Sequence, residues 1–167
     1  MFNAGDVVLY AMQGICKVVE VSTKDLTGEL LEYYVLKPVY NGPCTIFVPV
    51  RNEALTSKMR SPLSVDEVLD LIKKMPEMCF AWMEDEKERW GEFETILSHG
   101  DRAEIIKLIE TLYQHKLDQK AKGKKLHAAD ERILGEAERI IHEEFGHILN
   151  IRPDRVVSFI QEQVESR

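Results

Sequence analysis

The sequence predicts an α+β protein of two domains, a small antiparallel β-barrel over residues 1–55 and an all-α helical domain over residues 64–167. Two observations predict this class. In the first third of the chain, short β-branched and aromatic runs recur about every 8–12 residues, which is typical of small barrels. Beyond residue 63, apolar residues recur at helical spacing. The charge changes at the same boundary, because residues 1–60 are neutral and the whole net charge of −7 belongs to the remainder.

The strands of the first domain are expected within four runs that turn residues separate, at residues 6–10, 15–21, 32–39 and 45–50. The segment Leu26–Glu29 reads as a hairpin turn, because Gly28 can adopt a positive φ angle. Pro38 and Pro49 cannot donate a hydrogen bond to a neighbouring strand, so we expect both at strand ends, bulges or edges. The length and strand pattern suit a five-stranded SH3- or Tudor-like barrel.

Five helices are expected in the second domain. Ser64 with Glu67 forms a capping box before the first helix, which ends at Pro76. Pro153 suits the first turn of the last helix. The three helices between them are predicted from near Trp82 to about Leu97, from Asp101 to about Leu117, and from about Ala128 to Leu149.

Composition excludes several classes of protein. The three cysteines, at positions 16, 44 and 79, form no CxxC pair, which argues against a zinc knuckle, a redox motif or a disulfide scaffold. The N-terminal residues resemble no secretory signal, and no apolar run reaches the roughly 20 residues of a membrane span. We therefore expect a cytoplasmic protein without a membrane partner.

No motif predicts an enzyme. His142 and His147 resemble a zinc-binding HExxH pair but are five residues apart, which turns the second side chain away from the first. The run Glu84–Glu88 carries four carboxylates on one short stretch and is interpreted as a solvated face. The GxSxG, P-loop and GxGxxG motifs are absent. We expect no catalysis, no cofactor, no metal and no small-molecule substrate.

A basic segment interrupts the acidic domain at residues 115–126, where five lysines accompany one aspartate. It is either a solvated loop or a surface that contacts phosphates without reading base sequence. Trp82 and Trp90, placed within about 80° of one another on one helix, are either core residues or an apolar wedge for a DNA base step. The DNA-binding candidates are Trp82, Arg89, Trp90, Arg102, Lys116, Lys120, Lys122, Lys124 and Lys125.

These residues belong to stretches that resemble the CarD-like bacterial transcription regulators. In the first domain the stretches are FNAGDVVLYAMQGICKVVEV, LTGELLEYYVLKPV and TIFVPVRN. In the second they are LSHGDRAEIIKLI, LYQHK, KGKKLHAADERIL and EAERIIHEEF, so the resemblance covers nearly the whole chain. A domain similar to the first also occurs in the transcription-repair coupling factor.

The resemblance implies a function without catalysis. Family members bind the β subunit of bacterial RNA polymerase through an edge strand of a Tudor-like domain. Their helical domain contacts promoter DNA at the upstream edge of the transcription bubble, and together these contacts stabilise the open complex. The polymerase-binding residues that this implies are Lys24, Cys44, Thr45, Ile46, Phe47 and Val48.

This chain departs from the family at two of the implied positions. Phe47 stands where the family can carry an arginine that touches the β subunit. If Trp90 matches the aromatic residue that follows the family's wedge tryptophan, the wedge position is Glu86, which would repel phosphate. Trp82, one helical turn earlier, is the candidate substitute.

Two other functions stay open. The first is an SH3-like protein–protein interaction module that docks a different partner without DNA contact, its helices serving self-association. The second is RNA binding by the barrel through Tyr33, Tyr34 and Phe47, although that reading calls for basic neighbours and residues 1–60 are neutral.

Overall fold

The computed structural model describes residues 1–165. It contains two compact units, Met1–Pro62 and a second unit that begins at Leu63. The first unit is a β-sheet with one short helix, and the second is helical, so the predicted α+β class is confirmed. The last two residues of the predicted helical domain, 166–167, lie outside the described residues.

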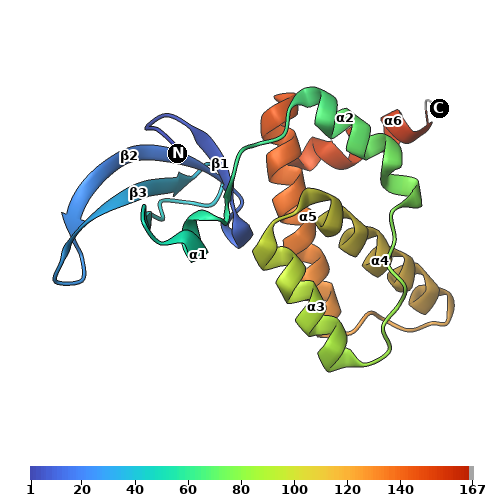
Figure 1. Ribbon diagram of the computed structural model, residues 1–167. Coiled ribbons are helices and arrows are strands. Elements are labelled where there is room, and N and C mark those ends of the chain that lie inside the picture. Colours follow the sequence, from blue (N-terminus) through green and yellow to red (C-terminus); the bar gives the residue numbers. More distant parts are fainter. Residues whose placement is uncertain (166–167) are drawn as a thin grey trace. The chain divides into compact units, whose positions relative to one another are not determined.

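Five strands form one antiparallel sheet in the first unit, in the order β4-β3-β2-β1-β5. Figure 1 shows the long β2–β3 hairpin that dominates this sheet. The strands are β1 (Val7–Tyr10), β2 (Ile15–Asp25), β3 (Leu30–Pro38), β4 (Ile46–Pro49) and β5 (Met59–Arg60). The sequence pattern predicted the first four but missed β5 and the four-residue helix α1 (Glu53–Thr56).

Turn chemistry explains where the strands reverse. Gly28 has a φ of 94°, and its amide donates a hydrogen bond to Oδ1 of Asp25, which closes the hairpin between β2 and β3. Gly14 has a φ of 78° and follows the 3-10 turn η1 (Ala11–Gln13), so the chain passes directly from β1 to β2. Pro38 and Pro49 are the last residues of β3 and β4, where the sequence placed them.

The core of this unit is apolar and is centred on β1, β2 and β3. Cys16 is fully buried among these side chains, whereas Cys44 is exposed and lies before β4, outside the strand. The buried cluster comprises Val8, Cys16, Val18, Tyr34, Leu36, Val48 and Met59.

The described part of the second unit contains five α-helices and two 3-10 turns. Ser64 caps the first helix by accepting a hydrogen bond from the Glu67 amide, as the capping box predicted. Pro76 lies in the 3-10 turn after that helix. Pro153 is the first residue of the 3-10 turn that precedes the last helix. The elements are α2 (Val65–Lys74), η2 (Met75–Glu77), α3 (Glu86–His99), α4 (Arg102–Ala121), α5 (Ala128–Leu149), η3 (Pro153–Arg155) and α6 (Val156–Glu165).

One predicted helix start is wrong. The sequence pattern placed it near Trp82, but α3 begins at Glu86, because the Asp85 side chain accepts a hydrogen bond from the Glu88 amide and caps the helix there. Trp82 therefore lies in the non-helical segment before α3. The predicted angle between Trp82 and Trp90 on one helix does not apply.

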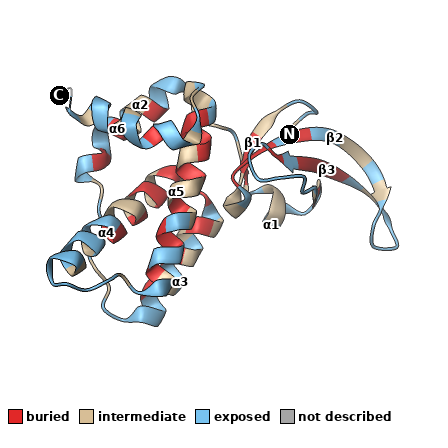
Figure 2. Ribbon diagram, turned by 180° about the vertical axis from the view of Figure 1, so that it is seen from behind, coloured by how far each residue is buried: buried red, intermediate tan, exposed pale blue. Residues whose placement is uncertain are grey.

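Helix α5 contacts each of α2, α3, α4 and α6 and carries the largest share of the unit's buried residues (Figure 2). Phe93 on α3 and Phe145 on α5 are the two largest fully buried side chains. Across residues 1–165, no helix combines the length and the apolarity that crossing a membrane requires.

Candidate functional site

Strand β4 is one edge of the sheet, since it lies at the end of the strand order and pairs with β3 alone among the described strands. Its register with β3 opposes Phe47 to Val35 and Val48 to Tyr34. An edge strand exposes backbone N–H and C=O groups that a strand of another protein can pair with. Of the predicted polymerase-binding residues, Ile46, Phe47 and Val48 lie on this edge strand. Cys44 and Thr45 lie in the exposed segment before it.

Side chains alternate along β4. Val48 is fully buried and Ile46 packs against the same core, so neither offers its side chain to a partner. Phe47 points away from that core, is 40% exposed, and contacts Tyr33 edge to face with ring centroids 6.3 Å apart. Phe47 is thus the apolar side chain that this edge presents, whereas Val48 is buried and Ile46 is half-buried against the core.

Pro49 ends the strand and limits its hydrogen bonding, because a proline has no N–H to donate. Beside Pro49 a shallow groove of about 630 Å³ opens between the end of β4 and the β2–β3 hairpin. Exposed Arg51 lines this groove together with Glu32. Arg51 is not among the predicted site residues, although a basic residue directly after the VPV run was a usable signal.

Lys24, the other predicted polymerase-binding residue, does not lie on the β4 edge. It is on β2 opposite Leu31 of β3, and its Nζ forms an ion pair with Oε1 of Glu20 at 2.9 Å. The Lys24 hydrogen bond lowers the pKa of Glu20. Since β4 pairs with residues 33–36 of β3, Lys24 is nearer the hairpin tip than any β4 residue.

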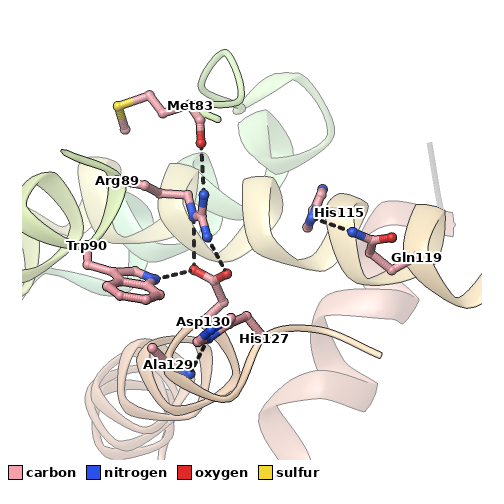
Figure 3. Close-up of polar contacts among 8 residues, drawn as sticks. All are labelled: Met83, Arg89, Trp90, His115, Gln119, His127, Ala129 and Asp130. Carbon is pink, nitrogen blue, oxygen red and sulfur yellow. Dashed lines mark hydrogen bonds and ion pairs between the residues drawn. The ribbon is translucent and has the colours of Figure 1, made fainter. Parts of the chain in front are cut away.

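In the second unit, a buried ion pair joins α3 to α5. The Arg89 guanidinium donates to both carboxylate oxygens of Asp130, from Nε to Oδ1 at 3.0 Å and from Nη2 to Oδ2 at 2.7 Å. The indole N–H of Trp90 donates to the same Oδ1 at 3.1 Å. Figure 3 shows Arg89 and Trp90 both pointing toward this carboxylate. Asp130 is therefore the acceptor that fixes two of the predicted DNA-binding residues.

The segment that carries Trp82 is tied to the helices on both sides of that residue. The Phe80 amide donates to Oγ1 of Thr111 at 2.8 Å, and the Met83 carbonyl accepts from Nη1 of Arg89 at 2.9 Å. The Trp82 ring stacks on His115 of α4, with centroids 3.6 Å apart and planes 13° from parallel. The Arg89 guanidinium carbon lies 4.5 Å from the Trp82 ring centroid. Trp82 is thus half-buried, and its ring is held in contact with both His115 and Arg89.

A polar hollow of about 310 Å³ lies beside the Trp82 ring. Trp82, His115, His127 and Lys125 line it, and so do the carboxylates Glu84 and Glu86. Burial, followed by the nearby Arg89 charge, lowers the pKa of His115, so this ring is neutral at neutral pH. Arg89 and Asp130 also line the hollow but pair with each other. The two glutamates would repel a phosphate, which leaves Lys125 as the lining cation that has no ion pair in the described residues.

The predicted lysines fall into two groups. Lys116 on α4 forms an ion pair with Glu131 at 2.9 Å, and that hydrogen bond raises its pKa. The other four lie in the last turn of α4 and the loop that follows, and they are exposed without an ion pair to any residue in 1–165: Lys120, Lys122, Lys124 and Lys125. Among the predicted DNA-binding residues, these four are the cations left to meet a polyanion.

Two predicted DNA-binding residues are corrected. Arg89 is only 4% exposed and is held by Asp130, as described above. Arg102 is 9% exposed, and its Nε donates to both carboxylate oxygens of Glu144 at 3.0 Å. A buried guanidinium that pairs with a carboxylate cannot also neutralise a phosphate outside the protein. Both arginines stabilise the helical unit instead of extending the lysine surface.

The two histidines that resembled a metal motif both lie on α5, His142 half-buried and His147 exposed. In the described part of the chain, no group of three His, Cys, Asp or Glu side chains is arranged to hold a metal ion.

The comparisons with known proteins bear on the first unit. Residues 2–61 match the model of the CarD-like/TRCF RID domain family. The matched range contains all five strands, including the β4 edge with Phe47. The search of curated proteins gave no match for the chain.

Proposed function

From the match of residues 2–61 to the CarD-like/TRCF RID domain family, we propose that the chain is a non-catalytic regulator of bacterial transcription. The match supports an RNA-polymerase-interacting, transcription-related protein. In our proposal the first unit binds the β subunit of RNA polymerase, the helical unit contacts promoter DNA, and both contacts stabilise the open complex in the cytoplasm.

The single observation that carries this proposal is the β4 edge. It lies inside the matched domain, its outer backbone is unpaired among the described strands, and Phe47 is exposed on it. A strand of the partner that adds to this edge gains backbone hydrogen bonds, and an apolar pocket for Phe47 would set the register. Where the resemblance implies an arginine that contacts the β subunit, this chain would make the contact by burying Phe47.

The lysine surface supports the DNA contact. Lys120, Lys122, Lys124 and Lys125 are exposed at the end of α4 and in the loop that follows, and Lys125 lines the same hollow as Trp82. Contacts of this kind bind phosphates and release counterions without reading base sequence. In our proposal Trp82, half-buried beside this hollow, is the aromatic residue that contacts DNA at the edge of the melted region.

In this proposal, the charge distribution is the reason that the polymerase has to bring the helical unit to the promoter. The helical unit carries the whole net charge of −7, so it has little affinity for arbitrary duplex DNA. Anchoring through the first unit would raise the local concentration of the lysine surface at the promoter. Tight binding of the isolated protein to random DNA at physiological salt would contradict this mechanism.

The test of polymerase binding compares two substitutions in the full chain. Phe47→Glu places a charge on the β4 edge, and Val19→Glu places the same charge on β2, at a residue that is also 40% exposed. We expect the β-subunit lobe to be retained by the unaltered chain and by Val19→Glu, and lost with Phe47→Glu. If the unaltered chain fails to bind the lobe, the sheet docks a different protein, and the polymerase proposal is wrong.

The test of DNA contact uses two pairs of adjacent exposed lysines. Lys124→Gln with Lys125→Gln alters the proposed surface, and Lys73→Gln with Lys74→Gln removes the same charge from α2. We expect only the first pair to shorten the lifetime of open complexes and to reduce the slope of log lifetime against log salt by about 1 per lysine. Equal effects of the two pairs would show that net charge, not this surface, is responsible.

A further inference from the structure

The helical unit contains a second cavity, lined by residues of η2, α4, α5 and α6 and distinct in its lining from the hollow beside Trp82. Its volume is about 380 Å³, within the range of pockets that hold small organic molecules. The walls are mainly aliphatic, formed by Met75, Ile106, Ile109, Ile141, Val157 and Ile160.

The rim of this cavity is apolar as well. Tyr113 on α4 is 47% exposed and Val157 on α6 is 45% exposed, and both side chains line the cavity. Apolar surface at a concave opening is stabilised by an occupant that removes it from water. The shape and the walls therefore favour a ligand with an apolar body.

Two carboxylates define the charge of the cavity. Glu110 of α4 and Glu138 of α5 line it, and neither side chain forms a hydrogen bond or an ion pair with another residue of the described chain. Burial raises the pKa of both side chains. The nearest cation that acts on Glu138, Lys116, is bound to Glu131 instead. A positive group inside the cavity would offset the desolvation of both carboxylates.

The other polar groups of the cavity do not supply that positive charge. Gln161 is neutral, and burial lowers the pKa of His142, which keeps its ring uncharged at neutral pH. An anionic ligand would meet two carboxylates and no cation. Among the charge types of small apolar molecules, the lining is complementary to a cation.

We propose that this cavity, which we call the amine pocket, binds a small amphiphile that carries one cationic amine on an apolar body. The amine lies between Glu110 and Glu138, and the apolar body contacts Ile106, Ile109 and Val157. This proposal does not depend on polymerase or DNA binding, because none of these residues belongs to the β4 edge or the lysine surface.

The experiment titrates the full chain with three probes of matched apolar body, namely phenylbutylamine, phenylbutanol and phenylbutyrate. Methyl NMR signals of Ile106, Ile109 and Val157 report occupancy of the cavity. We expect saturable shifts of these methyls with the amine, at an affinity about tenfold or more above that of the alcohol, and no saturation with the carboxylate.

A double substitution tests the role of the carboxylates. Glu110→Gln with Glu138→Gln keeps the shape of the cavity and removes its charge, and Glu88→Gln with Glu92→Gln removes the same charge from exposed positions on α3. We expect the first pair to lower the amine affinity to that of the alcohol and the second pair to leave it unchanged. An unchanged amide spectrum checks that both variants fold.

Three results would overturn the proposal. Equal affinities for amine and alcohol would mean that the cavity has no preference for a cation. The absence of saturable shifts with every probe would mean that it binds no such molecule. Shifts of the same methyls with protein concentration alone would mean that a second copy of the chain covers the cavity.

Discussion

The two units of this protein differ in what they bury. In the described residues of the first unit no charged side chain is buried, and its core is apolar apart from two tyrosines. The described residues of the second unit bury five charged side chains, Arg89, Arg102, Asp130, Glu143 and Glu144. Two of its arginines, Arg89 and Arg102, are paired inside the unit. Among the predicted DNA-binding residues, contact with an anion is therefore left to the exposed lysines.

The largest effect is expected from breaking the ion pair that distinguishes the second unit. Asp130→Ala leaves the Arg89 guanidinium buried without its acceptor and also removes the partner of the Trp90 indole. We expect the free energy of unfolding, measured by urea denaturation at neutral pH, to fall by about 3–5 kcal/mol.

A compensated variant serves as its control. Arg89→Met with Asp130→Leu makes this part of the second unit resemble the apolar core of the first. Replacing both charges should cost less than removing one, because no unpaired buried charge remains. A double variant as unstable as Asp130→Ala would mean that the packing of these side chains, and not their charge, is what stabilises the unit.

A smaller effect is expected from the core of the first unit. Val8 is fully buried there, opposite Cys16 of β2. Val8→Ala removes two methyl groups and leaves a cavity, which should lower the free energy of unfolding by about 2 kcal/mol. Because no charge is involved, the loss measured by urea denaturation should be the same at low and high salt. A loss that depends on salt would argue against a purely apolar core.

The smallest effect concerns half-buried carboxylates. Burial raises the pKa of Glu110, so the folded state binds a proton more tightly than the unfolded state, whose ordinary value is 4.5. Stability therefore falls as the pH rises from 4.5 through the folded pKa. Glu110→Gln should remove this dependence and stabilise the protein at neutral pH by up to about 1 kcal/mol, a gain that vanishes below pH 4.5.

Glu20 in the first unit is the control of opposite sign. Its pKa is lowered by the Lys24 hydrogen bond, so its contribution to stability is present above 4.5 and is lost as the pH falls through the folded pKa. Glu20→Gln should slightly destabilise the protein at neutral pH, as urea denaturation over a pH series can measure. If both glutamine variants shifted stability in the same direction, charge burial would not be what separates the two units.

Local signals in the sequence predicted most of the fold. Strands β1 to β4 follow from β-branched runs and turn residues, and the predicted bounds of α5, Ala128–Leu149, agree with the structure. Asp85 with Glu88 was a readable start signal for α3 that the apolar pattern around Trp82 obscured. Strand β5 has two residues and is too short to show a period.

The site was harder to predict because its interactions join distant parts of the chain. Arg89 and Asp130 are 41 residues apart, and Arg102 and Glu144 are 42 apart, so no local spacing shows that these arginines are buried. A charged residue in an amphipathic helix looks exposed until its partner on another helix is known. The exposure of the four lysines could be predicted directly, because a lysine-rich segment interrupted by a glycine is typical of a solvated loop. Their role in DNA binding stays a prediction.

The short β4 edge that ends at Pro49 has a consequence for how the protein behaves at high concentration. An open sheet edge invites identical copies to stack strand upon strand, which is the route to fibres. With only four residues and a proline that donates nothing, this edge offers too few bonds for such growth to continue from copy to copy. A different protein that adds a single strand is not affected by this small number of bonds, because its binding does not have to continue from copy to copy. The β4 edge can thus pair with one partner strand without promoting the growth of fibres.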